Sequence, residues 1–200
     1  YFTDWQNPVI GHMQHNLRDP SRDQTHGRVY RVTCKDRPLT EVVKISGEPI
    51  PALLELLKDS DNRVRYRTRI ELSGRDTDEV IQAVNEWVAS LGDDPANEHH
   101  LLEALWVQQH HNVVNESLLL RLLNAEDFRA RAAATRVLCD WRDRVPSSLE
   151  LLRTLAADEN PRVRLEAVRA ASFFTAPEAV EVAIIADEQP SDQFLRYVDR

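Results

Sequence analysis

The sequence predicts a mainly α-helical protein: an α-solenoid of about four and a half helix pairs, preceded by a short β segment. Only two of the five glycines lie beyond residue 47. That long stretch is rich in Leu, Ala, Glu and Arg, which favour helix. A short motif also recurs there about every 33 residues. Residues 1–47 instead mix glycine, proline and aromatic residues, a composition typical of strands and ordered loops.

The recurring motif contains two arginines separated by one residue. Its second arginine is Arg65, Arg131 or Arg164, with spacings of 66 and 33 residues, and Arg196 follows 32 residues later. A degenerate copy therefore falls between the first two. A period of this size is typical of stacked helix pairs, in which each pair buries its apolar face against its neighbours.

Apolar residues at helical spacing predict each helix in turn. Gly92 is a stop signal, and Pro51, Pro146, Pro161 and Pro177 lie near helix starts, where a missing N–H costs little. The expected helices are Pro51 to Leu57, Val64 to Leu72, Asp78 to Leu91, His99 to His110, Asn115 to Leu123, Phe128 to Trp141, Ser147 to Ala156, Pro161 to Phe174, Pro177 to Ala186 and a truncated Asp192 to Arg200.

The first part of the chain predicts strands and a long polar loop. Residues from Arg28 to Cys34 alternate in the pattern of a half-buried strand, and Tyr1 to Asp4 could end another. We expect a β segment over residues 1–38, a linker over 39–47 and the solenoid over 48–200. Cys34 and Cys139 lie in apolar patterns and are expected to be buried.

Composition excludes several classes of protein. The net charge is −8, so a nucleic-acid-binding surface is not expected, and no apolar run approaches the ~20 residues of a membrane helix. Without a CxxC pair, a cysteine zinc site, a disulfide scaffold and a covalently bound haem are excluded within this chain. The chain starts at Tyr1 without Met and stops at Arg200 inside a predicted helix. We therefore expect a segment of a longer protein, whose compartment stays open.

The clearest copy of the motif, Asp158 to Ala171 (DENPRVRLEAVRAA), resembles HEAT repeats. The resemblance covers residues 48–200 and implies that an acidic residue caps the second helix of each pair. It also implies that the arginine forms a ladder between neighbouring repeats. These roles fall on Asp61 with Arg65, on Asp127 with Arg131, and on Asp158 or Asn160 with Arg164.

The N-terminal part carries a second resemblance. Residues 4–32 contain, in order, DW, NP, GH, RDP, RD and HGRVYRV. This order resembles the last blade of a β-propeller of the sugar (sorbosone/glucose) dehydrogenase type. Followed by HEAT repeats, it is similar to large membrane-bound dehydrogenases of planctomycete-type bacteria.

That second resemblance implies a role for the solenoid. It would be a scaffold or spacer in an exported, periplasmic or cell-envelope dehydrogenase that oxidises a sugar-like alcohol or aldehyde. It also implies a quinone in the propeller and a c-type haem downstream at a CxxCH site, so no cofactor and no complete active site are expected in this chain. The alternative is a non-catalytic protein–protein interaction scaffold. Its partners would be other proteins or neighbouring domains of the same chain.

A short polar segment holds the candidate ligand-binding residues. One interpretation is a ligand-facing rim, in which imidazoles transfer protons and arginines bind an anionic or polyhydroxylated ligand. A second is a loop held by Arg–Asp pairs and Asx turns, which we favour. A third is a metal site, although no spacing here is specific for one. The residues are His12, His15, Arg18, Asp19, Arg22, Asp23, His26 and Arg28.

Three further groups favour a structural interpretation. The pairs His99 with His110 and His100 with His111 would be ~16 Å apart along a helix, too far to share one metal ion. Trp87, Trp106 and Trp141 are expected in the solenoid core rather than as exposed anchors. The arginines at 129, 131, 136, 142 and 144 are expected to form the ladder and i,i+4 pairs with Glu126, Asp140 and Asp143 rather than a phosphate-binding surface.

Overall fold

The computed structural model describes residues 1–4, 25, 27–36, 38 and 41–198. Contacts divide the chain into two units, Tyr1–Val43 and Lys44–Arg200. The candidate rim residues from His12 to Asp23, together with His26, lie outside the described residues.

The described part of the first unit contains a small antiparallel sheet. Strand β1 (Phe2–Asp4) pairs with β2 (Arg28–Tyr30), and Phe2 lies opposite Tyr30 with its ring stacked at 5.0 Å between centroids. The expected half-buried strand to Cys34 is wrong. β2 ends at Tyr30 because β1 offers it three partners, and residues 28–34 are all exposed. Cys34 is therefore exposed, not buried as predicted.

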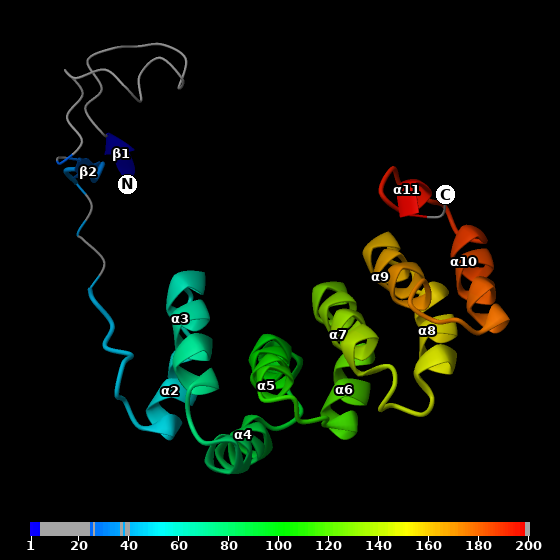
Figure 1. Cartoon of the computed structure of the whole chain (residues 1–200), viewed down its shortest axis with the longest axis horizontal. Coiled ribbons are helices and arrows are strands. Elements are labelled where there is room, and N and C mark those ends of the chain that lie inside the picture. The colour runs from blue at the N-terminus through cyan, green and yellow to red at the C-terminus, as the bar shows by residue number, and fades with distance from the viewer. Residues whose placement is uncertain (5–24, 26, 37, 39–40, 199–200) are drawn as a thin grey trace. The chain divides into compact units, whose positions relative to one another are not determined.

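The second unit is a stack of helix pairs, which confirms the predicted mainly α-helical solenoid. Figure 1 shows the second helices along the inner side of an arc and the first helices along its outer side. The first helices of the described pairs are α2 (Ile50–Leu56), α4 (Thr77–Leu91), α6 (Glu116–Leu123), α8 (Ser148–Ala156) and α10 (Val180–Asp187). The second helices are α3 (Asn62–Ser73), α5 (Glu98–His110), α7 (Phe128–Trp141), α9 (Pro161–Ala171) and α11 (Leu195–Val198).

The observed helix ends differ from the expected ones mainly in the C-terminal pairs. Helix α9 ends at Ala171 rather than Phe174, because the chain tightens there into a turn: the amides of Phe173 and Phe174 bond three residues back. The segment Pro177–Ala179 forms a 3₁₀ turn (η2) before α10, and another (η1, Pro95–Asn97) precedes α5. Within the described residues, no helix is both long and apolar enough to cross a membrane.

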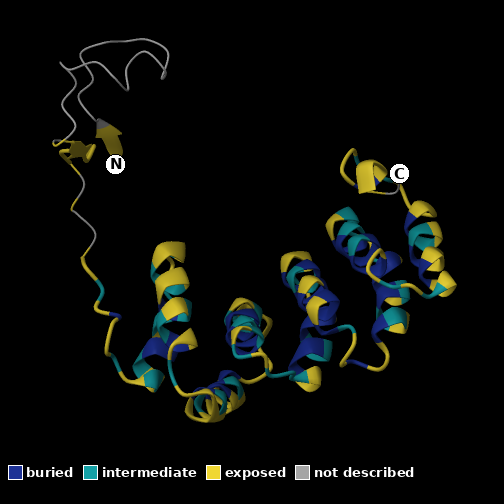
Figure 2. Ribbon diagram, viewed as in Figure 1, coloured by how far each residue is buried: buried dark blue, intermediate teal, exposed yellow. Residues whose placement is uncertain are grey.

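The buried residues lie mainly on the parts of the helices that face other helices of the stack (Figure 2). Trp141 and Trp87 are buried, as predicted, and Trp87 Nε1 donates to Glu55 at 2.9 Å. Trp106 is only half-buried, which corrects the expectation of a core position. Its ring lies 5.2 Å from the Arg69 guanidinium, because α5 presents it beside the arginine-rich α3.

Side-chain caps set where most of the second helices begin. Asp61, Asp127 and Asn160 each accept a hydrogen bond from the backbone N–H two residues later, at the start of α3, α7 and α9. Such caps satisfy N–H groups that have no partner inside the helix. Asp192 does the same for Phe194 and Leu195 before α11. Each cap therefore fixes the register of the arginine four residues further on.

Candidate functional site

Arg65, Arg131 and Arg164 occupy the same position, four residues after the cap of their helix. Each turns its Nη1 group back onto two carbonyl oxygens in the loop before that helix. Arg65 donates to Asp59 O (2.6 Å) and Ser60 O (3.1 Å), Arg131 to Ala125 O (2.9 Å) and Glu126 O (3.0 Å), and Arg164 to Asp158 O (2.8 Å) and Glu159 O (3.1 Å). These bonds close the loop between the two helices of each pair.

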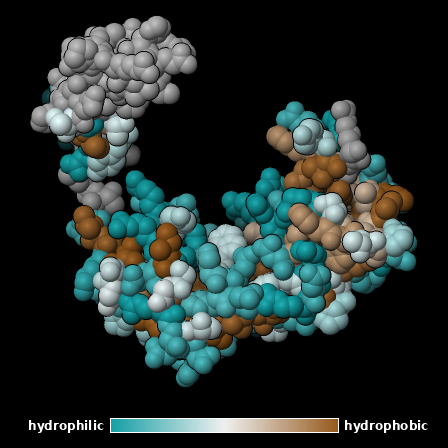
Figure 3. Space-filling view, viewed as in Figure 1, coloured by the Kyte–Doolittle hydropathy of each residue, from teal (hydrophilic) through white to brown (hydrophobic). Residues whose placement is uncertain are grey.

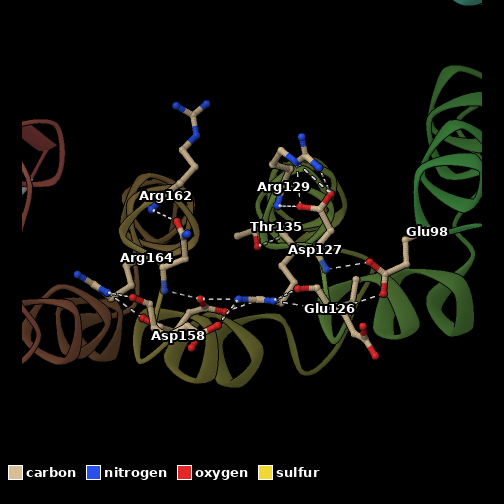
Figure 4. A network of polar contacts seen from close by, with 12 residues as sticks. Glu98, Glu126, Asp127, Arg129, Thr135, Asp158, Arg162 and Arg164 are labelled. Carbon is tan, nitrogen blue, oxygen red and sulfur yellow. Dashed lines mark hydrogen bonds and ion pairs between the residues drawn. The ribbon is translucent and has the colours of Figure 1, made fainter. Parts of the chain in front are cut away.

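The same three arginines also reach the following pair. Arg131 Nε and Nη2 donate to the Asp158 carboxylate at 2.7 and 3.0 Å (Figure 4). Arg65 Nε donates to Glu103 Oε1 at 3.0 Å, and Arg164 Nη2 to Pro190 O at 2.6 Å. We call this series of contacts the arginine ladder.

The degenerate repeat also contacts the next pair, but through a side chain that accepts hydrogen bonds instead of one that donates them. Its helix α5 has Leu101 where the others carry the ladder arginine. Instead, Glu98 accepts hydrogen bonds from the backbone N–H of Glu126 (2.6 Å) and Asp127 (2.9 Å) in the next pair. In two other repeats a local aspartate accepts the equivalent bond: the Asp61 N–H donates to Asp59 Oδ1, and the Asn160 N–H donates to Asp158 Oδ1. Ala125 has no carboxylate at that position, so Glu98 replaces it.

The structure separates two roles that the sequence left open. Asn160, not Asp158, caps α9, while Asp158 receives Arg131. Asp61 and Asp127 are caps, and the pKa of each lies below its usual value because an arginine two residues later bonds to the carboxylate. The hydrogen bonds from Arg131 to the Asp158 carboxylate raise the pKa of Arg131.

Two buried glutamates were missed by sequence reasoning. Glu103 and Glu166 both lie six residues after the cap position of a second helix. Glu103 binds Arg65 and Arg69 of α3, and His99 Nε2 lies 3.5 Å away. Glu166 contacts Arg162 (3.1 Å), Arg169 (2.9 Å) and, in the preceding pair, Arg136 (3.7 Å). For Glu166 the available signal was the pair of arginines at helical spacing on either side of it, Arg162 and Arg169. Helix α5 contains no arginine, so its sequence carried no such signal for Glu103.

The two helix layers carry opposite charge. The second helices contain eleven arginines and five acidic residues. The first helices contain two arginines and eight acidic residues. The inner helix layer (α3, α5, α7, α9 and α11) is thus positive within a chain of net charge −8.

The inner helix layer is also grooved between α7 and α9. This groove has a volume of ≈ 410 Å³ and is lined by Phe128, Ala132 and Ala133 together with Arg129, Arg136, Arg162 and Glu166. We call it the α7/α9 groove. The wider apolar areas in Figure 3 lie instead over the C-terminal helices, where Phe173, Val180, Ile184 and Phe194 are exposed.

The histidines near α5 act at helix ends and on the surface. His111 contacts Leu72 O and Thr77 Oγ1, each at 3.1 Å, and so joins the first two pairs. His100 Nδ1 lies 3.2 Å from Asn97 Oδ1, and His110 is exposed. Partial burial of its ring lowers the pKa of His99. Within the described residues no three His, Cys, Asp or Glu side chains cluster as metal ligands.

The basic stretch in and after α7 is largely paired, but not with the expected partners. Arg129 pairs with Asp127, Arg131 with Asp158 and Arg136 with Glu166. Arg144 reaches Asn112, while Asp140 accepts from Gln109. The expected i,i+4 pairs are replaced because these side chains reach loops and neighbouring pairs; of the expected acidic partners, Asp143 contacts Arg142 at 3.8 Å.

Of the candidate rim residues, only Arg28 is described. Its Nη1 donates to the Tyr30 hydroxyl at 3.1 Å within β2. Cys139 is buried, and burial raises the pKa of its thiol, which disfavours the reactive thiolate. Among the described residues, the second helices thus present an extended surface rich in arginine.

This architecture defines the second unit as a helical-repeat solenoid. Residues 115–198 match the family model for HEAT repeats, which supports the HEAT resemblance for α6 to α11. The chain matches no curated protein and no solved structure.

Proposed function

We propose that Lys44–Arg200 is a non-catalytic scaffold that binds a protein partner through its inner helix layer. The observation that carries this proposal is the separation of charge between the two layers. A purely structural stack would need the arginine ladder, yet it would not need exposed arginines beyond it. Arg129, Arg136 and Arg162 keep more than half of their side-chain surface exposed.

Exposed apolar side chains on the first inner helix support the same surface. Tyr66 and Ile70, one turn apart on α3, are each more than half exposed. Large apolar residues beside arginines are the side-chain types that contribute most to protein interfaces.

A matched pair of variants tests the proposal. Tyr66→Ser with Ile70→Ser alters the inner helix layer, and Val180→Ser with Ile184→Ser alters an equally spaced, equally exposed pair on the outer helix α10. The unaltered chain and each variant are immobilised, and the proteins that each of them retains are compared by quantitative mass spectrometry. We expect a retained protein that is lost with the inner variant and kept with the outer one. Equal retention by both variants would contradict the proposal.

For the whole protein, we propose that the solenoid is a spacer in an exported dehydrogenase-like protein of the periplasm or cell envelope. The support is the motif order in residues 4–32. A quinone and a haem would then be bound outside this chain. Sequencing the gene on both sides of the segment tests this. Propeller blades upstream and CxxCH downstream would support it and justify assays of sugar oxidation and haem reduction. A start codon just before Tyr1 and no CxxCH after Arg200 would leave the binding scaffold alone.

A further inference from the structure

We propose that the α7/α9 groove binds an acidic peptide segment in extended conformation, with carboxylates spaced three residues apart. This inference rests on the proposed binding function and names the chemistry of the partner. It depends on three properties of the groove: its floor, its charge and the spacing of its arginines.

The floor of the groove is apolar and shallow. Ala132 and Ala133 leave a space of ≈ 410 Å³ between the two helices, and Phe128 forms part of its wall. This volume suits a few small side chains of a peptide. A nucleic-acid duplex would instead contact a broad surface, and the acidic outer layer and the net charge of −8 disfavour its approach.

The rim of the groove has excess positive charge. Three arginines line the groove (Arg129, Arg136 and Arg162), and their carboxylate partners are Asp127 and Glu166. Arg136 lies 3.7 Å from Glu166, beyond a good hydrogen bond. Each guanidinium has five N–H donors, so donors remain for an incoming ligand.

The chemistry and spacing of the rim favour carboxylates along an extended chain. The planar guanidinium fork binds a carboxylate through two parallel hydrogen bonds. Arg129 and Arg136 are seven residues apart on α7, which corresponds to a rise of about 10 Å along the helix. In the extended polyproline II conformation, three residues make one turn and rise about 9 Å, so side chains three residues apart lie on the same face at nearly this distance. A peptide that follows α7 can therefore place one carboxylate at each arginine.

The probe is a fluorescein-labelled peptide, Gly-Glu-Val-Thr-Glu-Val-Thr-Glu-Gly, titrated with the full chain and followed by fluorescence anisotropy. Three ligands are compared with it: the peptide with Gln for every Glu, a peptide of the same composition with its three Glu adjacent, and a labelled 15-base-pair DNA duplex. Arg136→Gln and Arg162→Gln remove groove charges. Arg121→Gln on the outer helix α6 removes one charge elsewhere and is the control.

We expect the spaced Glu peptide to bind most tightly and to weaken as salt rises from about 0.05 to 0.3 M. Each groove variant should weaken binding about threefold to tenfold, and the control variant less than twofold. Both groove arginines are well exposed, so the variants should fold, which circular dichroism verifies. Equal losses with the control variant, tighter binding of the duplex, or no binding at about 1 mM protein would overturn the inference.

The two proposals fail separately. If the peptide does not bind but the α3 variant still loses its retained protein, the acidic-peptide inference is wrong and the scaffold function stands. If the α3 variant retains the same proteins as the outer variant while the peptide binds in the groove, the proposed function is contradicted and the acidic-peptide inference stands.

Discussion

Arg131 and Asp158 join two helix pairs through a two-pronged ion pair, 27 residues apart in sequence. The same guanidinium closes the loop before its own helix through two carbonyl oxygens. One side chain thus fixes both the internal turn of a pair and its stacking on the next. Because both groups are mostly shielded from water, solvent screens this pair less than an exposed ion pair.

Replacing a buried ladder arginine should destabilise the solenoid. Arg164→Ala leaves three carbonyl oxygens without their donor, so we expect a loss of about 2–4 kcal/mol in the free energy of unfolding. Arg196→Ala is the control, since Arg196 holds the same repeat position but is exposed and donates to Asp192 O in its own turn. Urea denaturation measures both variants. Equal midpoints for the two would count against the ladder.

The reversed contact at Glu98 predicts a rescue. Glu98→Ala should lower stability by about 1 kcal/mol, since it removes the acceptor of two backbone N–H groups. Adding Ala125→Asp supplies the local aspartate that two other repeats use and should restore part of that loss. If Ala125→Asp destabilises the protein equally with and without Glu98, the two carboxylates are not equivalent.

The fold was predictable because its signals are local and repeated. Helix spacing, the caps and the arginine period each depend on residues close in sequence. The ends of α9 and α10 were less predictable, since a tightened last turn and a 3₁₀ start differ little from helix in sequence. The prediction of a half-buried strand was wrong for another reason. Alternation from Arg28 to Cys34 predicts a strand with one buried face, but burial of that face requires a second layer of structure. These residues are all exposed.

Glu103 should be essential for packing α5 against α3. Its carboxylate is buried and neutralises Arg65 and Arg69, so Glu103→Gln leaves two shielded guanidinium groups without a counter-charge. We expect a loss of about 3 kcal/mol. Glu116→Gln, an exposed change on α6, serves as the control and should alter stability by less than about 1 kcal/mol. A Glu103→Gln variant as stable as that control would refute the role.

Acid stability should depend on the aspartate caps. The pKa of Asp127 is lowered in the folded state by its bonds from Arg129, so this group stabilises the fold above the unfolded pKa of about 4. That contribution is lost as pH falls through the lower, folded pKa. Asp127→Asn keeps a cap, as Asn160 does for α9, but cannot titrate.

Thermal melting at several pH values between about 5 and 3 measures this effect. The wild type should lose more stability over that interval than the Asp127→Asn variant. Parallel curves for the two proteins would show that Asp127 does not contribute to the acid transition.

The proposed binding surface was less predictable from the sequence than the fold. The sequence shows that arginines recur, but their separation from the acidic residues emerges only when the helices are sorted into two layers. The shared carboxylates at Glu103 and Glu166 depend on contacts between pairs. The groove depends on Ala132 and Ala133, which in sequence look like ordinary helix formers.

A double-mutant cycle on Arg131 and Asp158 tests the central claim that the ladder couples neighbouring pairs. The free energies of unfolding of Arg131→Ala, Asp158→Ala and the double variant are measured by urea denaturation. We predict a coupling energy of about 1–3 kcal/mol, with the double variant less destabilised than the sum of the single ones. Additive losses, with coupling below about 0.3 kcal/mol, would contradict the claim.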